Sequence, residues 1–179
     1  MGHVVRLSEG RDAIQAYVGA QTSQGLPHVL SLVTQDNLAV VGLIADLTED
    51  EGMTVTPVDI WRAYDVMKHM SASLDRSRTR LETLTSGRPF ENPAGIGPGK
   101  QGNVDYASFY ELRSAYIDGM AEIIGVLRGA DPSRGIDLTA EHAQYGPFNW
   151  LGWATYSHHV HTHDHIGQLT NIVQALRTS

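Results

Sequence analysis

Apolar side chains recur every three to four positions along four long stretches of the chain, the spacing that gathers them on one face of a helix. These stretches are expected to be helices over residues 28–47, 57–84, 105–128 and 149–176. A shorter helix is expected over residues 8–20, which begin with serine, a residue that can cap a helix, and end at a polar run. No stretch alternates apolar and polar residues as a half-buried strand does, so we expect no sheet.

Local signals support the start of the second long helix. Thr56 supplies a capping hydroxyl, Pro57 suits the first helical position, and Asp59 places a carboxylate in the first turn. The apolar stripe of this helix is then expected to include Ile60. Four helices with one apolar stripe each predict an all-α fold, a four-helix bundle with a short extra N-terminal helix, as a single domain over residues 1–179.

Two connectors are expected, over residues 86–103 and 129–147, and both are rich in glycine, proline or polar residues. Residues 95–102 contain several glycines and a lysine, but neither the hydroxyl residue after the lysine nor the preceding strand that a phosphate-binding loop requires. We interpret this segment as a connector or a pocket lid. Aromatic residues after the second connector, Phe148, Trp150 and Trp153, are expected to seal one end of the bundle.

Composition and charge narrow the function further. The net charge of −7 argues against binding of nucleic acid and against docking on an anionic membrane. No apolar run reaches the roughly 20 residues that span a bilayer, and residues 1–7 lack the pattern of a signal peptide, so we expect a cytoplasmic protein. The chain has no cysteine, so any thiol chemistry would come from a small cosubstrate.

Histidine is the residue that suggests chemistry, because five of the nine histidines lie within residues 158–165. On a helical wheel, three of them (His158, His161 and His165) point toward the apolar stripe, whereas His159 and His163 point toward its flank. This pattern leaves two alternatives. The run is either a solvated histidine tract or part of an interior metal site.

A metal site would use His161 and His165, because residues four apart present both imidazoles on one side of a helix, each able to reach a cation at about 2 Å. A third ligand must come from another helix. In the second long helix the candidate is His69, which lies at the edge of the apolar stripe.

Two short motifs resemble the DinB/YfiT-like superfamily. Asp-Val-Met-Lys-His-Met at residues 65–70, following Thr56-Pro57 and Trp61, resembles its second helix. The final-helix motif, two histidines four apart and a glutamine three residues later, is similar to residues 161–169. The resemblance implies a four-helix bundle, often a homodimer, that binds zinc or nickel through His69, His161 and His165. Three protein ligands leave a coordination position open, which is typical of catalytic sites.

The same resemblance implies an activity, because relatives include the mycothiol-dependent maleylpyruvate isomerase and thiol S-transferases. We therefore expect a metal-dependent S-transferase or isomerase that acts on a small-molecule substrate with a low-molecular-weight thiol. Two alternatives stay open. One is a metal-dependent hydrolase, and the other is a non-enzymatic metal-binding or small-ligand-binding bundle of the stress-response type.

Three further polar residues fall where apolar ones are expected. Asp36 is either a hydrogen-bond acceptor for a metal-bound imidazole or a polar residue at the rim or in a dimer contact. His158 is either a fourth ligand or a packed residue of the pocket, and both Asp36 and His158 are candidate bases for a hydrolase. Arg113 is either a binding group for a substrate carboxylate or a structural residue whose charge reaches the surface or an acid.

Overall fold

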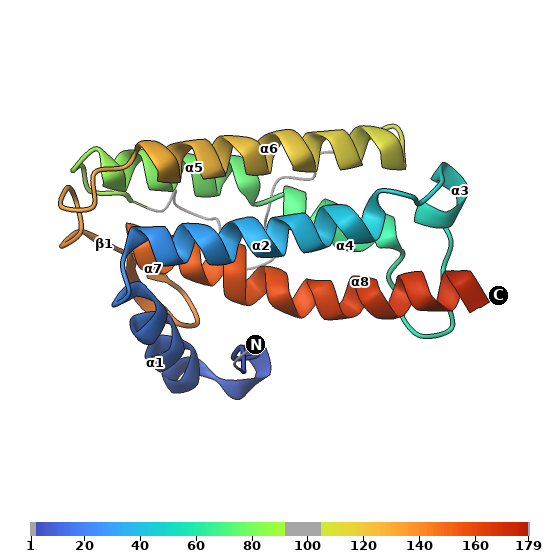
Figure 1. Cartoon of the computed structure of the whole chain (residues 1–179), viewed down its shortest axis with the longest axis horizontal. Coiled ribbons are helices and arrows are strands. Elements are labelled where there is room, and N and C mark those ends of the chain that lie inside the picture. Colours follow the sequence, from blue (N-terminus) through green and yellow to red (C-terminus); the bar gives the residue numbers. More distant parts are fainter. Residues whose placement is uncertain (1–2, 92–104, 179) are drawn as a thin grey trace.

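The computed structural model describes residues 3–91 and 105–178 and is mostly helical (Figure 1). The segment at residues 95–102, interpreted from the sequence as a connector or lid, lies outside the described residues. Among the described helices, none combines the length and the apolar character needed to cross a bilayer.

In chain order the helical elements are the 3-10 turn η1 (Leu7–Glu9), α1 (Arg11–Thr22), α2 (Leu26–Ile44), α3 (Glu49–Gly52), α4 (Ala63–Ser71), α5 (Leu74–Thr85), α6 (Phe109–Gly129), α7 (Trp150–Thr155), the π-helical turn η2 (Tyr156–Val160) and α8 (His161–Thr178). Helices α2, α6 and α8 run along the long axis of the molecule (Figure 1). Helix α2 packs against α6 and α8, and α4 packs against the same two helices. The core therefore lies between these four elements. Its largest fully buried side chains include Tyr116, Phe109, Ile44, Met67 and Met120.

The second predicted helix begins later than its sequence signals indicate. Residues 57–62 are not helical, and α4 begins at Ala63 after Arg62, whose side chain and backbone both pair with Asp65. The carboxylate of Asp59, expected in the first turn of this helix, instead accepts from the backbone N–H of Trp61 at 2.9 Å. The predicted start was therefore wrong. Ile60, expected in the buried stripe, lies in this non-helical segment and is 86% exposed.

A small hairpin corrects the expectation that the chain has no sheet. Strand β1 (Thr139–His142) pairs antiparallel with β2 (Gly146–Asn149), within the connector expected to be irregular. Each strand has four residues, too few for alternation to stand out in the sequence. The turn closes at Gly146, whose φ of 87° is the left-handed conformation that glycine adopts without strain.

Aromatic residues seal the end of the molecule next to this hairpin. Phe148, Trp150 and Trp153 are all buried, as the sequence predicts. The indole N–H of Trp150 donates to the Arg134 carbonyl, and that of Trp153 donates to the Ala140 carbonyl, so their polar atoms are satisfied inside the core. This end anchors α7, which leads directly into the histidine-rich run.

Candidate metal centre

Two helices bring together the three histidines that the sequence groups. His69 lies in the last turn of α4, and His161 and His165 lie in the first two turns of α8. Because α4 packs against α8, the imidazole of His69 faces the pair that the four-residue spacing aligns on α8. The group thus combines a contact within α8, between His161 and His165, with contacts of His69 across the interface between α4 and α8.

The ring nitrogens of this group lie close together. The Nε2 atom of His161 lies 3.2 Å from Nε2 of His69 and 3.3 Å from Nε2 of His165. One ligand atom from each residue lies within 4.8 Å of both others. Nitrogens that share a tetrahedral ion at about 2.0–2.1 Å lie roughly 3.3 Å apart, so the spacing is that of a metal-ligand set.

Burial keeps these imidazoles in the form that binds metal. It is the main cause that lowers the pKa of His161 to about 3, followed by the neighbouring His165 and His69. Burial also lowers the pKa of His69 and of His165, and in His165 the hydrogen bond to Gln168 opposes this effect. At neutral pH all three rings are therefore uncharged and carry a nitrogen lone pair.

A hydrogen-bonded chain orients one of the three rings. Nδ1 of His165 donates to Oε1 of Gln168 at 2.9 Å, which leaves the lone pair on Nε2, the atom facing the other two histidines. The amide nitrogen of Gln168 in turn donates to Oδ2 of Asp59 at 2.9 Å. Since Asp59 also accepts from the backbone of Trp61, the loop before α4 is tied to α8 beside the site.

Aromatic rings and the N-terminal segment line the neighbourhood of the cluster. Trp61 meets the His69 ring edge-on, with centroids 5.5 Å apart, and Tyr156 lies 6.5 Å from the His161 ring. The backbone N–H of Leu7 donates to Asp164, the residue just before His165. These contacts place aromatic rings beside His69 and His161 and tie the N-terminal segment to α8.

The donor set fits a divalent transition metal. If each Nε2 carries a lone pair, three partial negative charges converge within hydrogen-bond distance, an arrangement that a shared cation relieves. Three neutral imidazole donors suit zinc or nickel, whereas magnesium and calcium prefer oxygen ligands.

His158 does not belong to this group. Its side chain is buried, and its Nε2 atom lies 2.7 Å from Oγ of Ser77 on α5. Burial, with a smaller contribution from Arg80, lowers its pKa to about 4, so the ring is neutral. Of the two roles that the sequence allows, the contact with Ser77 favours a packed core histidine over a fourth ligand.

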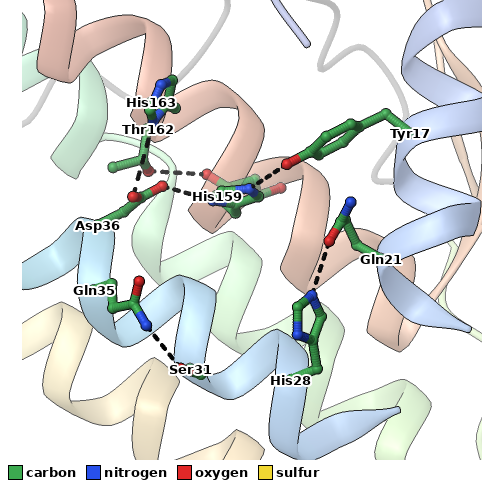
Figure 2. Close-up of polar contacts among 10 residues, drawn as sticks. Tyr17, Gln21, His28, Ser31, Gln35, Asp36, His159, Thr162 and His163 are labelled. Atoms are coloured by element: carbon green, nitrogen blue, oxygen red, sulfur yellow. Dashed lines mark hydrogen bonds and ion pairs between the residues drawn. The ribbon is translucent and has the colours of Figure 1, made fainter. Parts of the chain in front are cut away.

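Asp36 pairs with a histidine outside the group of three. Its Oδ2 atom lies 2.7 Å from Nδ1 of His159 and thus contacts none of the three clustered rings (Figure 2). Of the two roles that the sequence allows, these contacts do not support that of an acceptor for a metal-bound imidazole. His159 itself is buried and not on the flank, because α2 packs against η2 and the ring contacts Asp36 on α2 and Tyr17 on α1. His163, whose side chain is 42% exposed, does lie on the flank.

Arg113 belongs to α6, and its side chain reaches the C-terminal end of α2 and not the three histidines. Its Nη1 atom donates to the carbonyl oxygens of Ile44, Ala45 and Leu47, the last at 3.5 Å, and its guanidinium lies over the Tyr110 ring. The last carbonyls of a helix lack an intrahelical donor, and in the described part of the chain only that of Ile44 also accepts from a nearby backbone N–H, that of Leu47, so the contacts indicate a capping role.

Two features of the site were not foreseen from the sequence. The first is the contact of Asp59 with Gln168, because the sequence placed Asp59 at a helix start. Gln168 follows His165 by three residues, and an amide so placed was a signal that a further hydrogen-bond partner should exist. The second is the π-helical turn η2, which has no glycine or proline to mark it.

Comparisons with protein-family models, curated proteins and solved structures found no match to this chain.

Proposed function

We propose that this protein binds one zinc or nickel ion through His69, His161 and His165 and is a four-helix bundle of the DinB/YfiT-like superfamily. The observation that carries the proposal is the convergence of the three Nε2 atoms, with 3.2 Å and 3.3 Å between His161 and its two neighbours. The packing of α2 and α4 against α6 and α8 supports the bundle, and the short motifs around residues 65–70 and 161–169 support the superfamily.

The proposed activity is the transfer or isomerisation of a small-molecule substrate with the help of a low-molecular-weight thiol. When bound, the metal ion supplies the Lewis acidity that lowers the pKa of a thiol in an open coordination position. Two features support an open position: the ligand set has three members, and Nε2 of His158 is engaged by Ser77. The chain has no cysteine of its own to occupy that position.

The residues around the cluster would prepare it for this role. Gln168 keeps the proton of His165 on Nδ1, and Asp59 holds Gln168 in place. Trp61 and Tyr156 place apolar ring surface beside His69 and His161, and a less polar surrounding strengthens electrostatic interactions. A hydrolase is less well supported, because its two candidate bases, Asp36 and His158, are already paired with His159 and Ser77.

Cobalt substitution separates the metal proposal from the thiol proposal. The cobalt(II) protein should show the visible absorption of a low-symmetry site, and His69→Ala should remove it. Addition of low-molecular-weight thiols, with mycothiol and glutathione among them, should then produce a sulfur-to-cobalt charge-transfer band in the near ultraviolet. If the cobalt spectrum is present but no thiol changes it, the thiol proposal fails and metal binding stands.

A further inference from the structure

A second chain of polar groups links η2 to α1 and α2. Asp36 on α2 contacts Nδ1 of His159 at 2.7 Å, and Nε2 of the same ring lies 2.8 Å from the hydroxyl of Tyr17 on α1 (Figure 2). The side chains of His159 and Asp36 are 4% and 13% exposed. We call these three residues the Asp36–His159–Tyr17 chain.

The chemistry of the three groups sets the direction of their hydrogen bonds. An ionised carboxylate only accepts, so Nδ1 of His159 donates to Asp36. In the neutral ring Nε2 then carries the lone pair, and the hydroxyl of Tyr17 donates to it. Both ring nitrogens of His159 are therefore held, one from each of two helices that contribute no metal ligand.

The position of His159 in the chain gives this arrangement its significance. His159 lies inside the π-helical turn η2, which ends at Val160, and His161 is the next residue. A π-helical turn is rare and is less stable than regular α-helix unless other contacts hold it. The hydroxyl of Thr162, in the first turn of α8, also donates to the carbonyl of Ser157, five residues earlier, at 3.4 Å.

The rotation of α8 about its own axis, relative to α7, depends on this turn. If η2 closed into regular α-helix, the residues on either side of it would rotate relative to one another, because each backbone hydrogen bond would span four residues instead of five. With α7 anchored in the aromatic end of the core, that rotation would move His161 away from His69, which α4 holds independently.

We propose that the Asp36–His159–Tyr17 chain positions the metal ligands. It stabilises the π-helical geometry of η2, so that His161 faces His69 and His165. The inference rests on the proposed metal site. It makes the N-terminal helix α1 part of that site through Tyr17, although α1 contributes no ligand. Asp36, His159 and Tyr17 are positioning residues that act through His161.

The chain offers variants that separate positioning from packing. Asp36→Leu and Asp36→Asn have nearly the same shape, but only the amide oxygen of asparagine can still accept from Nδ1 of His159. Tyr17→Phe keeps the ring stacked on His159, with centroids 5.8 Å apart in the native protein, and removes only the hydroxyl. The matched control is Gln21→Ala, which breaks the 2.8 Å contact with His28, a different polar link between α1 and α2 (Figure 2).

The test is cobalt(II) titration of each protein, which measures the affinity and the visible spectrum of the bound ion. Asp36→Leu should bind cobalt about tenfold more weakly than the native protein, and the spectrum of the bound ion should change. A tenfold loss is the low end of what is lost when a contact that supports metal ligands is removed. Tyr17→Phe should shift both readouts in the same direction, while Asp36→Asn and Gln21→Ala stay close to the native values.

Native affinity and spectrum in both Asp36→Leu and Tyr17→Phe would overturn the positioning role and leave the metal site intact. Failure of the native protein to bind cobalt would instead overturn the metal site and the positioning role together.

Discussion

Replacement of Gln168 by methionine tests how the metal centre is organised. The side chains have similar length, but methionine can neither accept from Nδ1 of His165 nor donate to Asp59, contacts of 2.9 Å each in the structure. Without them the His165 ring can rotate or move its proton to Nε2, the atom that would bind the ion. Loss of a hydrogen bond that orients a metal-binding histidine weakens metal binding by about 10-fold to 100-fold, or about 1.4–2.8 kcal/mol.

The assay is competition for zinc between the protein and a chromophoric chelator at neutral pH. Gln174→Met is the matched control, because Gln174 is exposed and lies on the same helix two turns from the site. The thermal unfolding of each metal-free protein shows whether the fold is retained. Zinc affinity of Gln168→Met equal to that of the control would refute the role of Gln168 in orienting His165.

Three further predictions concern groups away from the ligands. The folded-state pKa of His158, about 4, lies below its usual 6.5, so its contribution to stability is complete above pH 6.5 and is lost as the pH falls toward 4. Denaturant unfolding of the metal-free protein should show this loss, about 3 kcal/mol, and an unchanged pH dependence in His158→Gln would contradict it. Arg113→Met should lower the free energy of unfolding by about 1–2 kcal/mol and leave zinc affinity unchanged; a selective loss of zinc binding would place Arg113 at the site after all. Gly135→Ala should destabilise the protein by about 1–3 kcal/mol, because Gly135 has a φ of 68° and an added Cβ would meet the Leu84 carbonyl; a native melting temperature would argue against that backbone conformation.

Local geometry explains which part of the site could be predicted from the sequence. Residues four apart on a helix face the same way, so the alignment of His161 with His165 follows from their spacing alone. The partner His69 lies 92 residues before His161, and its contact depends on how α4 packs against α8. Spacing could not supply that contact, which was expected from the superfamily resemblance.

Tertiary contacts explain the parts that were mispredicted. The carboxylate of Asp59 accepts from Trp61 and Gln168 and does not lie in the first turn of a helix, because α4 begins at Ala63. The burial of His159 follows from its partners on α1 and α2, which no local pattern reveals. In both places a polar side chain has a long-range partner that overrides its local preference.

Elemental analysis of the purified protein after dialysis is the most direct test of the metal centre. It should find about one zinc or nickel ion per chain in the native protein and none in His165→Ala, because two imidazoles bind such an ion more weakly than three. Absence of metal from the native protein after reconstitution, or equal retention in His165→Ala, would contradict the assignment of His69, His161 and His165 as a shared ligand set.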